Sequence, residues 1–318
     1  MKAIVNKKYG SPDILELREV ARPEPKSNEI LIRVLAASVN KADWHILNGK
    51  PYPVRLMSGL MKPKYQILGA DVAGVVERVG AKVTQFRPGD EVYGDLSGSG
   101  FGGFAEFVVT SENFIAKKPS SFTYEQAAAL PMAAVTALQG LRNKGGISQG
   151  DEVLINGASG GVGSFAVQIA KAFGAHVTAV CSTQKVDLAL QQGADIVVDY
   201  KKDDFTRMGK SYDLIFDTVA NHSIRSTERV LKKGGSYIAC AFSPGAMFLG
   251  PWYSVIKGKV MTNMLASTNQ ADLQYISKLA EEGKLKPVIQ DTFTLDDVPD
   301  ALKMMAKGSL TGKLVISM

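Results

Sequence analysis

A glycine-rich segment behind a short apolar strand is the feature that most constrains the fold of this chain. It runs Asn156-Gly157-Ala158-Ser159-Gly160-Gly161-Val162-Gly163, directly after Val153-Leu154-Ile155. Glycines allow a tight turn, and a helix that begins there points partly positive main-chain N–H groups at a phosphate. We interpret Ala158, Ser159, Gly160, Gly161, Val162 and Gly163 as a dinucleotide-binding turn. Because Ala158 replaces the first glycine of the G-x-G-x-x-G pattern, a plain strand-to-helix turn is the alternative, and the context must decide.

The context is an alternation of strands and helices over residues 122–285. Strands are expected at 152–156, 176–181, 195–200, 213–218 and 236–241, and helices at 163–173, 184–192 and 224–231. Such alternation predicts a parallel, doubly wound sheet. A strand at 259–265 would be the sixth, and a helix at 271–282 would cover it or lead away.

Residues 1–121 have a different texture, with short strands between frequent turn residues. Strands are expected at 30–36, 72–79, 91–94 and 104–109. The stretch 124–140 is alanine-rich and expected to be helical, and a last strand at 312–317 is expected to return to this lobe. The fold class is therefore α/β with two domains. The β-rich domain comprises 1–121 and 286–318, and the Rossmann domain comprises 122–285.

The end of the second parallel strand carries the signal for the type of dinucleotide. An NAD-specific protein usually places an acidic residue there, but this strand ends in Cys181-Ser182-Thr183. Ser182, Thr183, Lys185 and Tyr200 could instead hold a 2′-phosphate by hydrogen bonds and charge. The sequence predicts NADPH as the cofactor, although an exposed lysine at a helix start is the alternative reading of Lys185.

Composition excludes several other classes of protein. The net charge is +6, but the basic residues occur in scattered pairs, which does not favour nucleic acid as a partner. No apolar stretch reaches the ~20 residues of a membrane span. The amino-terminal sequence has no secretory pattern, and Cys181 and Cys240 fit buried thiols, so we expect a cytoplasmic protein.

Motifs along nearly the whole chain resemble the medium-chain dehydrogenase/reductase superfamily, specifically its zinc-free quinone oxidoreductase branch, which includes the chloroplast-envelope quinone oxidoreductase homologues. The matching segments are Ser38–Asp43, Gly69–Val76, Arg87–Val92, Gly103–Phe107, Ala129–Pro131, the glycine turn and Gly312-Lys313. The resemblance implies a GroES-like catalytic domain built from both chain ends, a Rossmann domain between them, and a homodimer formed through edge strands near 259–265. These expectations rest on fold analogy.

The resemblance also implies roles for single residues. Asn40 and Thr136 would lie beside the nicotinamide, Lys313 would belong to the cofactor site, and Asp43 would support its loop. Tyr52 follows Asn48-Gly49 as in quinone reductases and is a candidate catalytic residue, with a packed loop aromatic as the alternative. The segment 53–65 would line or cap the cleft, or fill core space.

Zinc-dependent relatives use a cysteine near the position of Asn40 and a His-Glu pair where this chain has Ala70 and Asp71. Without a metal, the site favours acceptors that are already electrophilic, such as quinones and α,β-unsaturated carbonyls. Asn40 or Tyr52 could stabilise the negative charge that builds on the carbonyl oxygen. The alternatives are an enoyl-thioester reductase and, in another class, an NADPH-binding structural, regulatory or RNA-binding protein.

Overall fold

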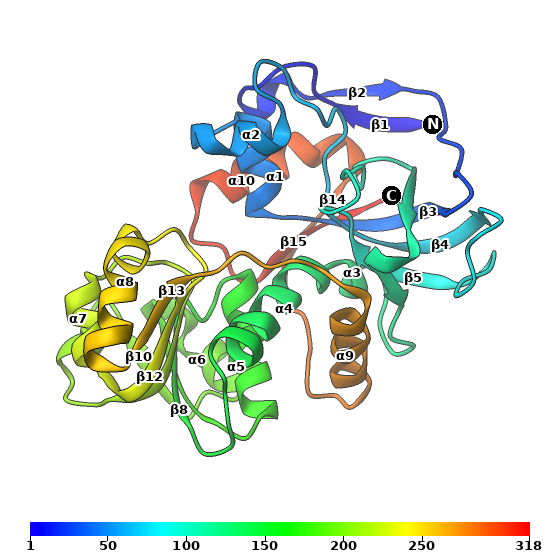
Figure 1. Ribbon diagram of the computed structural model, residues 1–318. Helices are drawn as coiled ribbons and strands as arrows, with labels where there is room; N and C mark the ends of the chain where they lie inside the picture. Colours follow the sequence, from blue (N-terminus) through cyan, green and yellow to red (C-terminus); the bar gives the residue numbers. More distant parts are fainter. The chain divides into compact units, whose positions relative to one another are not determined.

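The parallel sheet expected from residue 152 onward is present in the computed structural model, which describes residues 1–318 (Figure 1). Its strands are β8 (Glu152–Asn156), β9 (His176–Cys181), β10 (Ile196–Asp199), β11 (Tyr212–Asp217), β12 (Leu231–Ala239) and β13 (Val260–Asn263). Their order is β10-β9-β8-β11-β12-β13, and every neighbouring pair is parallel. The doubly wound topology and the sixth strand are confirmed.

The helices of this sheet agree less closely with the sequence pattern. They are α5 (Gly161–Ala172), α6 (Val186–Gln191), α7 (Ile224–Arg229) and α8 (Pro244–Lys257). The first turn predicted for 184–192 is a 3₁₀ helix, Thr183–Lys185. Helix α8 was not predicted, because it contains Pro251 and its apolar residues are not confined to one face.

The stretch expected to be helical, 124–140, is helical but divided. The chain forms α3 (Tyr124–Ala128) and α4 (Pro131–Leu138), followed by a π-helical turn over Gln139–Lys144. Pro131 has no N–H to donate and disfavours helical backbone at Leu130, so the first helix ends before it and a new one starts at it.

A second sheet gathers strands from both ends of the chain. Its strands are β3 (Glu29–Val39), β4 (Asp71–Val79), β5 (Glu91–Asp95), β6 (Phe107–Ser111), β7 (Ile115–Lys117), β14 (Ile289–Thr294) and β15 (Lys313–Ser317), in the order β14-β15-β3-β4-β5-β7, with β6 paired to β3. A separate hairpin pairs β1 (Lys2–Val5) with β2 (Glu16–Glu19). The expected return of the last strand is confirmed, because Leu314 of β15 pairs with Val39 of β3.

Helices α1 (Lys41–Asn48), α2 (Arg55–Ser58), α9 (Gln270–Glu281) and α10 (Val298–Lys307) belong with this second sheet. The chain divides into a β-rich unit, residues 1–132, 268–281 and 289–318, and a parallel-sheet unit, residues 133–267 and 282–288. These boundaries differ from those at 122 and 286 expected from the sequence. Helix α3 packs on β3 and β4, and the Tyr93 hydroxyl of β5 donates to the Leu273 carbonyl of α9 at 2.6 Å, so both helices join the β-rich unit. Helix α9 therefore leads away from the parallel sheet.

Candidate active site

The glycine turn has the main-chain geometry that a phosphate site requires. Strand β8 ends at Asn156, Gly157 has a φ of +81°, and α5 begins at Gly161. The N–H groups of Gly157 and Ala158 donate to the Val180 carbonyl of β9 at 3.1 and 3.0 Å, which fixes the first half of the turn. The N-terminal amides of α5 follow at once and are suited to an anion.

Gly163 accounts for the close packing of α5 on this turn. A Cβ at Gly163 would lie 2.1 Å from the Gly157 carbonyl oxygen, whereas one at Gly160 would have its nearest neighbour at 3.5 Å. The turn therefore requires glycine at 163 for packing, while Gly160, the helix N-cap, could accept a Cβ at ordinary van der Waals distance.

A polar cluster that was not predicted from the sequence lies at the strand ends next to the glycine turn. The Asn156 amide donates to Asp217 Oδ1 at 2.9 Å, and the Tyr237 hydroxyl donates to Asp217 Oδ2 at 3.0 Å. Burial raises the pKa of the Tyr237 hydroxyl, with the charge of Asp217 as a further cause. Asn156 and Asp217 end the neighbouring strands β8 and β11, and Tyr237 lies two residues before the end of β12, so these groups fix the ends of the strands from which the turn departs.

The residues predicted for the 2′-phosphate come together just beyond the carboxyl-terminal ends of β9 and β10. Strands β9 and β10 are parallel neighbours, and the Tyr200 N–H donates to the Cys181 carbonyl at 3.1 Å. Thr183 and Lys185 form the short 3₁₀ helix after Ser182. Partial burial lowers the pKa of Lys185. Asp199, which sequence reasoning missed, lies among them and accepts a hydrogen bond from the Thr183 hydroxyl at 2.6 Å.

In the β-rich unit, Asn40 and Lys313 meet in a buried polar cluster. The Lys313 ammonium donates to Asn40 Oδ1 at 2.5 Å and lies 3.3 Å from Asp71 Oδ2. The Asn40 amide nitrogen donates to the same Asp71 oxygen at 2.9 Å, as does the Ser38 hydroxyl at 2.9 Å. All four side chains are buried. Strand pairing causes this assembly, because β15 and β4 flank β3 on its two sides.

Asp71 is the centre of the cluster, and its role was not predicted. Its second oxygen, Oδ1, accepts from the Met132 main chain at 2.9 Å. Asp95 pairs with Asp71 across β4 and β5, and burial together with the charge of Asp71 raises the pKa of Asp95. The available signal was a charged residue directly before the apolar run Val72–Val76 of β4.

Asp43 supports the loop that carries Asn40, as the resemblance implied. It closes a capping box at the start of α1: Asp43 Oδ2 accepts from the Asn40 N–H at 2.8 Å, and Oδ1 accepts from the Gly69 N–H at 3.1 Å. Complete burial raises the pKa of Asp43 to about 7, and the two main-chain donors oppose this shift only in part.

This raised pKa predicts a pH dependence of stability. In the unfolded chain Asp43 titrates near the usual ~3.9, so the folded state binds the extra proton between about pH 4 and 7. The stabilisation from this proton is fully present below about pH 4 and is lost as the pH rises toward 7. In Asp43→Asn this contribution vanishes, so its free energy of unfolding should fall less than that of the native protein between pH 5 and 7.5. Urea denaturation at both pH values measures the difference, and equal falls would contradict the assignment.

Tyr52 does not belong to the Asn40 cluster. Its side chain is 70% exposed, and the Arg55 guanidinium lies 5.2 Å from the ring centre. Four further large apolar side chains around α2 are exposed, namely Leu56, Met57, Leu60 and Met61. These four side chains thus do not fill a core, whereas Tyr65 at the end of the segment 53–65 packs against one. Thr136 is buried on α4, in the parallel-sheet unit.

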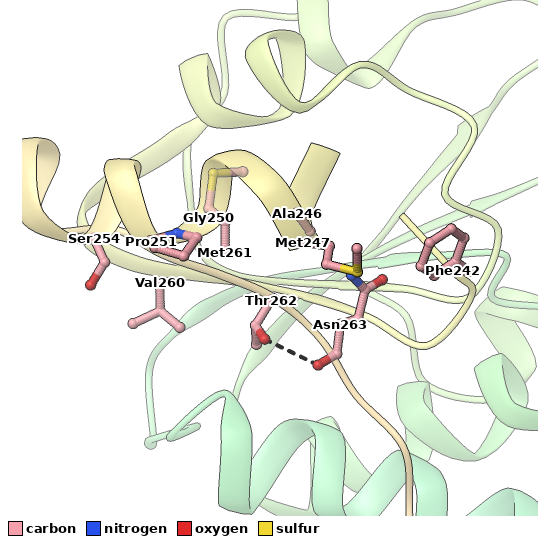
Figure 2. Close-up of a pocket in the computed structure, with 10 residues that line it drawn as sticks. All are labelled: Phe242, Ala246, Met247, Gly250, Pro251, Ser254, Val260, Met261, Thr262 and Asn263. Carbon is pink, nitrogen blue, oxygen red and sulfur yellow. Dashed lines mark hydrogen bonds between the residues drawn. The ribbon is translucent and has the colours of Figure 1, made fainter. Parts of the chain in front are cut away.

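A pocket of about 450 Å³ lies between α8 and the edge strand β13 (Figure 2). Its lining is mostly apolar and includes Phe242, Met247, Pro251 and Val260, and no predicted site residue contributes to it. Further exposed apolar side chains on α8 are Phe248, Leu249, Trp252, Val255 and Ile256. A homodimer through this edge stays a prediction.

Comparison with known proteins identifies the family. A model of the alcohol dehydrogenase GroES-like domain matches residues 26–120, and one described as zinc-binding dehydrogenase matches residues 192–316. The 2-methylene-furan-3-one reductase of Solanum lycopersicum is 36% identical over 99% of this chain and 79% of its own length. The chloroplast envelope quinone oxidoreductase homolog of Arabidopsis thaliana is 35% identical over 99% of this chain and 98% of its own.

Two further relatives agree with these. The chloroplastic NADPH-dependent alkenal/one oxidoreductase of Arabidopsis thaliana is 33% identical over 99% of this chain and 79% of its own length. The structure of the quinone oxidoreductase from Coxiella burnetii superimposes with a TM-score of 0.88 at 32% identity, over 100% of this chain and 99% of that one.

The chain belongs to the quinone-oxidoreductase-like branch of the medium-chain dehydrogenase/reductase superfamily. This enzyme is therefore an NAD(P)H oxidoreductase similar to quinone and alkenal reductases, with a GroES-like domain and a six-stranded Rossmann sheet. The resemblance and the fold class inferred from the sequence are confirmed. None of its helices is long and apolar enough to cross a membrane. Relatives bear chloroplastic and mitochondrial names, so the cytoplasmic location stays an expectation.

The zinc implied by one family description does not fit the residues of this oxidoreductase. Zinc prefers thiolate, imidazole and carboxylate ligands. The cluster offers an amide and one carboxylate, and the Lys313 ammonium already bonds both. No group of three or more His, Cys, Asp or Glu side chains is arranged to hold a metal.

Proposed function

We propose that the protein is an NADPH-dependent, zinc-independent reductase of quinones and α,β-unsaturated carbonyls. The observation that carries the proposal is the Lys313 ammonium bonded to Asn40 and Asp71, at the positions where zinc-dependent relatives have metal ligands. A fixed monovalent cation in this buried cluster cannot take up an alkoxide as an open metal position does. Substrates that are already electrophilic do not need a metal to stabilise an alkoxide. The names of the relatives, a furanone reductase and an alkenal/one oxidoreductase, support this choice of substrates.

The cofactor residues of this proposal lie in both units. A bound nicotinamide dinucleotide would supply the hydride. The glycine turn would hold its pyrophosphate through main-chain N–H groups and the positive end of α5. Ser182, Lys185 and Tyr200 would surround the 2′-phosphate. Thr183 lies beside them, but its hydroxyl proton is already donated to Asp199. Asn40, Thr136 and Lys313 would border the nicotinamide.

The hydrogen bonds of Asn40 define what this residue can do. Its carbonyl oxygen accepts from Lys313, and its amide nitrogen donates to Asp71 at 2.9 Å and faces the Ser38 carbonyl at 3.4 Å. With both ends engaged, Asn40 can position a neighbour but has no proton to spare for a carbonyl oxygen. The Tyr52 side chain is exposed, and its hydroxyl is the better candidate donor for the charge that develops there.

Steady-state assays test the activity directly. NADPH oxidation is followed with 1,4-quinones, 2-alkenals and 2-alkenones, with and without a metal chelator. We expect turnover that the chelator leaves unchanged, and Tyr52→Phe should lower kcat/KM by about a hundredfold, the lower end of the cost of one lost donor to developing charge. Failure of all three acceptors would overturn the proposal, and a rate that depends on a pantetheine thioester would favour an enoyl reductase.

The preference for NADPH makes a separate prediction. Lys185→Glu replaces a cation by a carboxylate and should weaken binding of NADPH about tenfold more than that of NADH, because only NADPH carries the 2′-phosphate. Titration of the intrinsic fluorescence gives both dissociation constants. Lys233→Glu is the matched control, because Lys233 is exposed near the amino-terminal end of β12, whereas Lys185 follows the carboxyl-terminal end of β9. The pairing of Ser236 with Val260, the first residue of β13, marks that amino-terminal end. Equal losses for both cofactors in Lys185→Glu would remove Lys185 from the phosphate site.

A further inference from the structure

A buried carboxylate lies among the residues assigned to the 2′-phosphate. Asp199 ends β10, pairs with Cys181 at the end of β9, and is 9% exposed. Its Oδ2 accepts from the Thr183 hydroxyl at 2.6 Å, and its Oδ1 accepts from the Lys201 N–H at 3.1 Å. The Thr183 hydrogen bond is the main cause that lowers the pKa of Asp199. The side chain is therefore an anion in a fixed position at neutral pH.

This carboxylate fixes the direction of the Thr183 hydroxyl. An ionised carboxylate only accepts hydrogen bonds, so the single hydroxyl proton of Thr183 points at Asp199. Thr183 is exposed, and what its oxygen offers outward is lone pairs. Lone pairs suit a donor such as a ribose hydroxyl, whereas a phosphate oxygen needs a donor and would be repelled.

The surrounding charges are mixed. Lys185, Lys201 and Lys202 bring positive charge to the carboxyl-terminal ends of β9 and β10, but Lys202 Nζ lies 3.8 Å from Asp199 Oδ2 and is partly neutralised by it. The lysines at these strand ends favour binding of a phosphate. The Asp199 carboxylate and the Thr183 hydroxyl, which can only accept there, oppose it. The balance between them decides which dinucleotide binds better.

We propose that Asp199 is a specificity-determining residue that holds Thr183 as an acceptor for a ribose hydroxyl, lowers the preference for NADPH, and so admits NADH as a second hydride donor. This inference rests on the proposed function, because it requires the adenosine ribose to lie at the ends of β9 and β10.

The test compares dissociation constants of NADPH and NADH for the native protein and Asp199→Asn. Asparagine keeps the shape and an oxygen acceptor for the Lys201 N–H, but it removes the charge and can donate to Thr183, which frees the Thr183 proton. We expect the preference for NADPH over NADH to rise about tenfold, the effect of one charge-assisted hydrogen bond gained. Asp203→Asn, an exposed neighbour with the same change of charge, should leave the preference unchanged.

A second variant, Thr183→Val, keeps the inference testable if Asp199→Asn fails to fold. Thr183→Val keeps the shape without the hydroxyl and should weaken NADH binding about fivefold while leaving NADPH within about twofold, because only the ribose hydroxyl uses the acceptor. An unchanged preference in Asp199→Asn, or equal effects of Thr183→Val on both cofactors, would overturn the inference. Absence of binding of either dinucleotide by the native protein would instead overturn the proposed function.

Discussion

Lys313→Met is expected to lower the free energy of unfolding by about 3–5 kcal/mol, the cost of leaving a buried charge without its partner. Lys313 and Asp71 are 3% and 0% exposed, so water cannot take over the role of the lost ammonium. The Asn40 carbonyl would lose its donor as well. Methionine has nearly the length of lysine, so the loss reflects charge and hydrogen bonding rather than an empty volume. Guanidinium denaturation at neutral pH measures it.

Two controls separate the charge from general damage. Lys307→Met on α10 removes an exposed lysine and should change the free energy of unfolding by less than about 0.5 kcal/mol. Asp71→Asn combined with Lys313→Met removes both charges and should be less destabilised than Lys313→Met alone. If the double variant is the less stable of the two, the ammonium does not balance Asp71.

Gly163→Ala should abolish most dinucleotide binding and destabilise the fold by about 1–3 kcal/mol. The added Cβ would lie 2.1 Å from the Gly157 carbonyl oxygen, which is main chain and cannot rotate away. Helix α5 must therefore shift from the turn, and its N-terminal amides lose their alignment. We expect the dissociation constant for NADPH to rise more than about tenfold, measured by calorimetry.

Gly160→Ala is the matched control for this change. It adds the same methyl group three residues earlier, where the nearest atom would be 3.5 Å away. Its backbone φ of −79° suits alanine, so its free energy of unfolding should stay near the native value. If Gly160→Ala loses as much stability as Gly163→Ala, the loss does not come from the contact between the added Cβ and the Gly157 carbonyl oxygen.

The sequence allowed the parallel sheet to be predicted closely because its signals are local. Strands β8 and β9 agree residue by residue with the expected 152–156 and 176–181, since each is an apolar run next to a turn or helix. Helix α8 gave no such signal, as Pro251 and apolar residues on several faces hide its period. Helices α1 and α10 and strand β14 were not predicted either.

The candidate site could be predicted only in parts. The glycine turn is one continuous segment, so its residues were identifiable without knowledge of the fold. The contact between Asn40 and Lys313 joins residues 273 positions apart, and only the pairing of β15 with β3 brings them together. Asp199 was overlooked because the expected acidic residue was sought at the end of β9, whereas it lies at the end of the neighbouring strand.

The position of β15 inside its sheet has a consequence for synthesis on the ribosome. Strand β15 lies between β14 and β3, so the sheet of the β-rich unit stays open until residues 313–317 have left the exit tunnel. Strands β8 to β13 are contiguous in sequence and can pair earlier. Until β15 arrives, Asp71 lacks the ammonium that balances it. A nascent chain would thus carry a folded parallel-sheet unit while its β-rich unit is still unfinished.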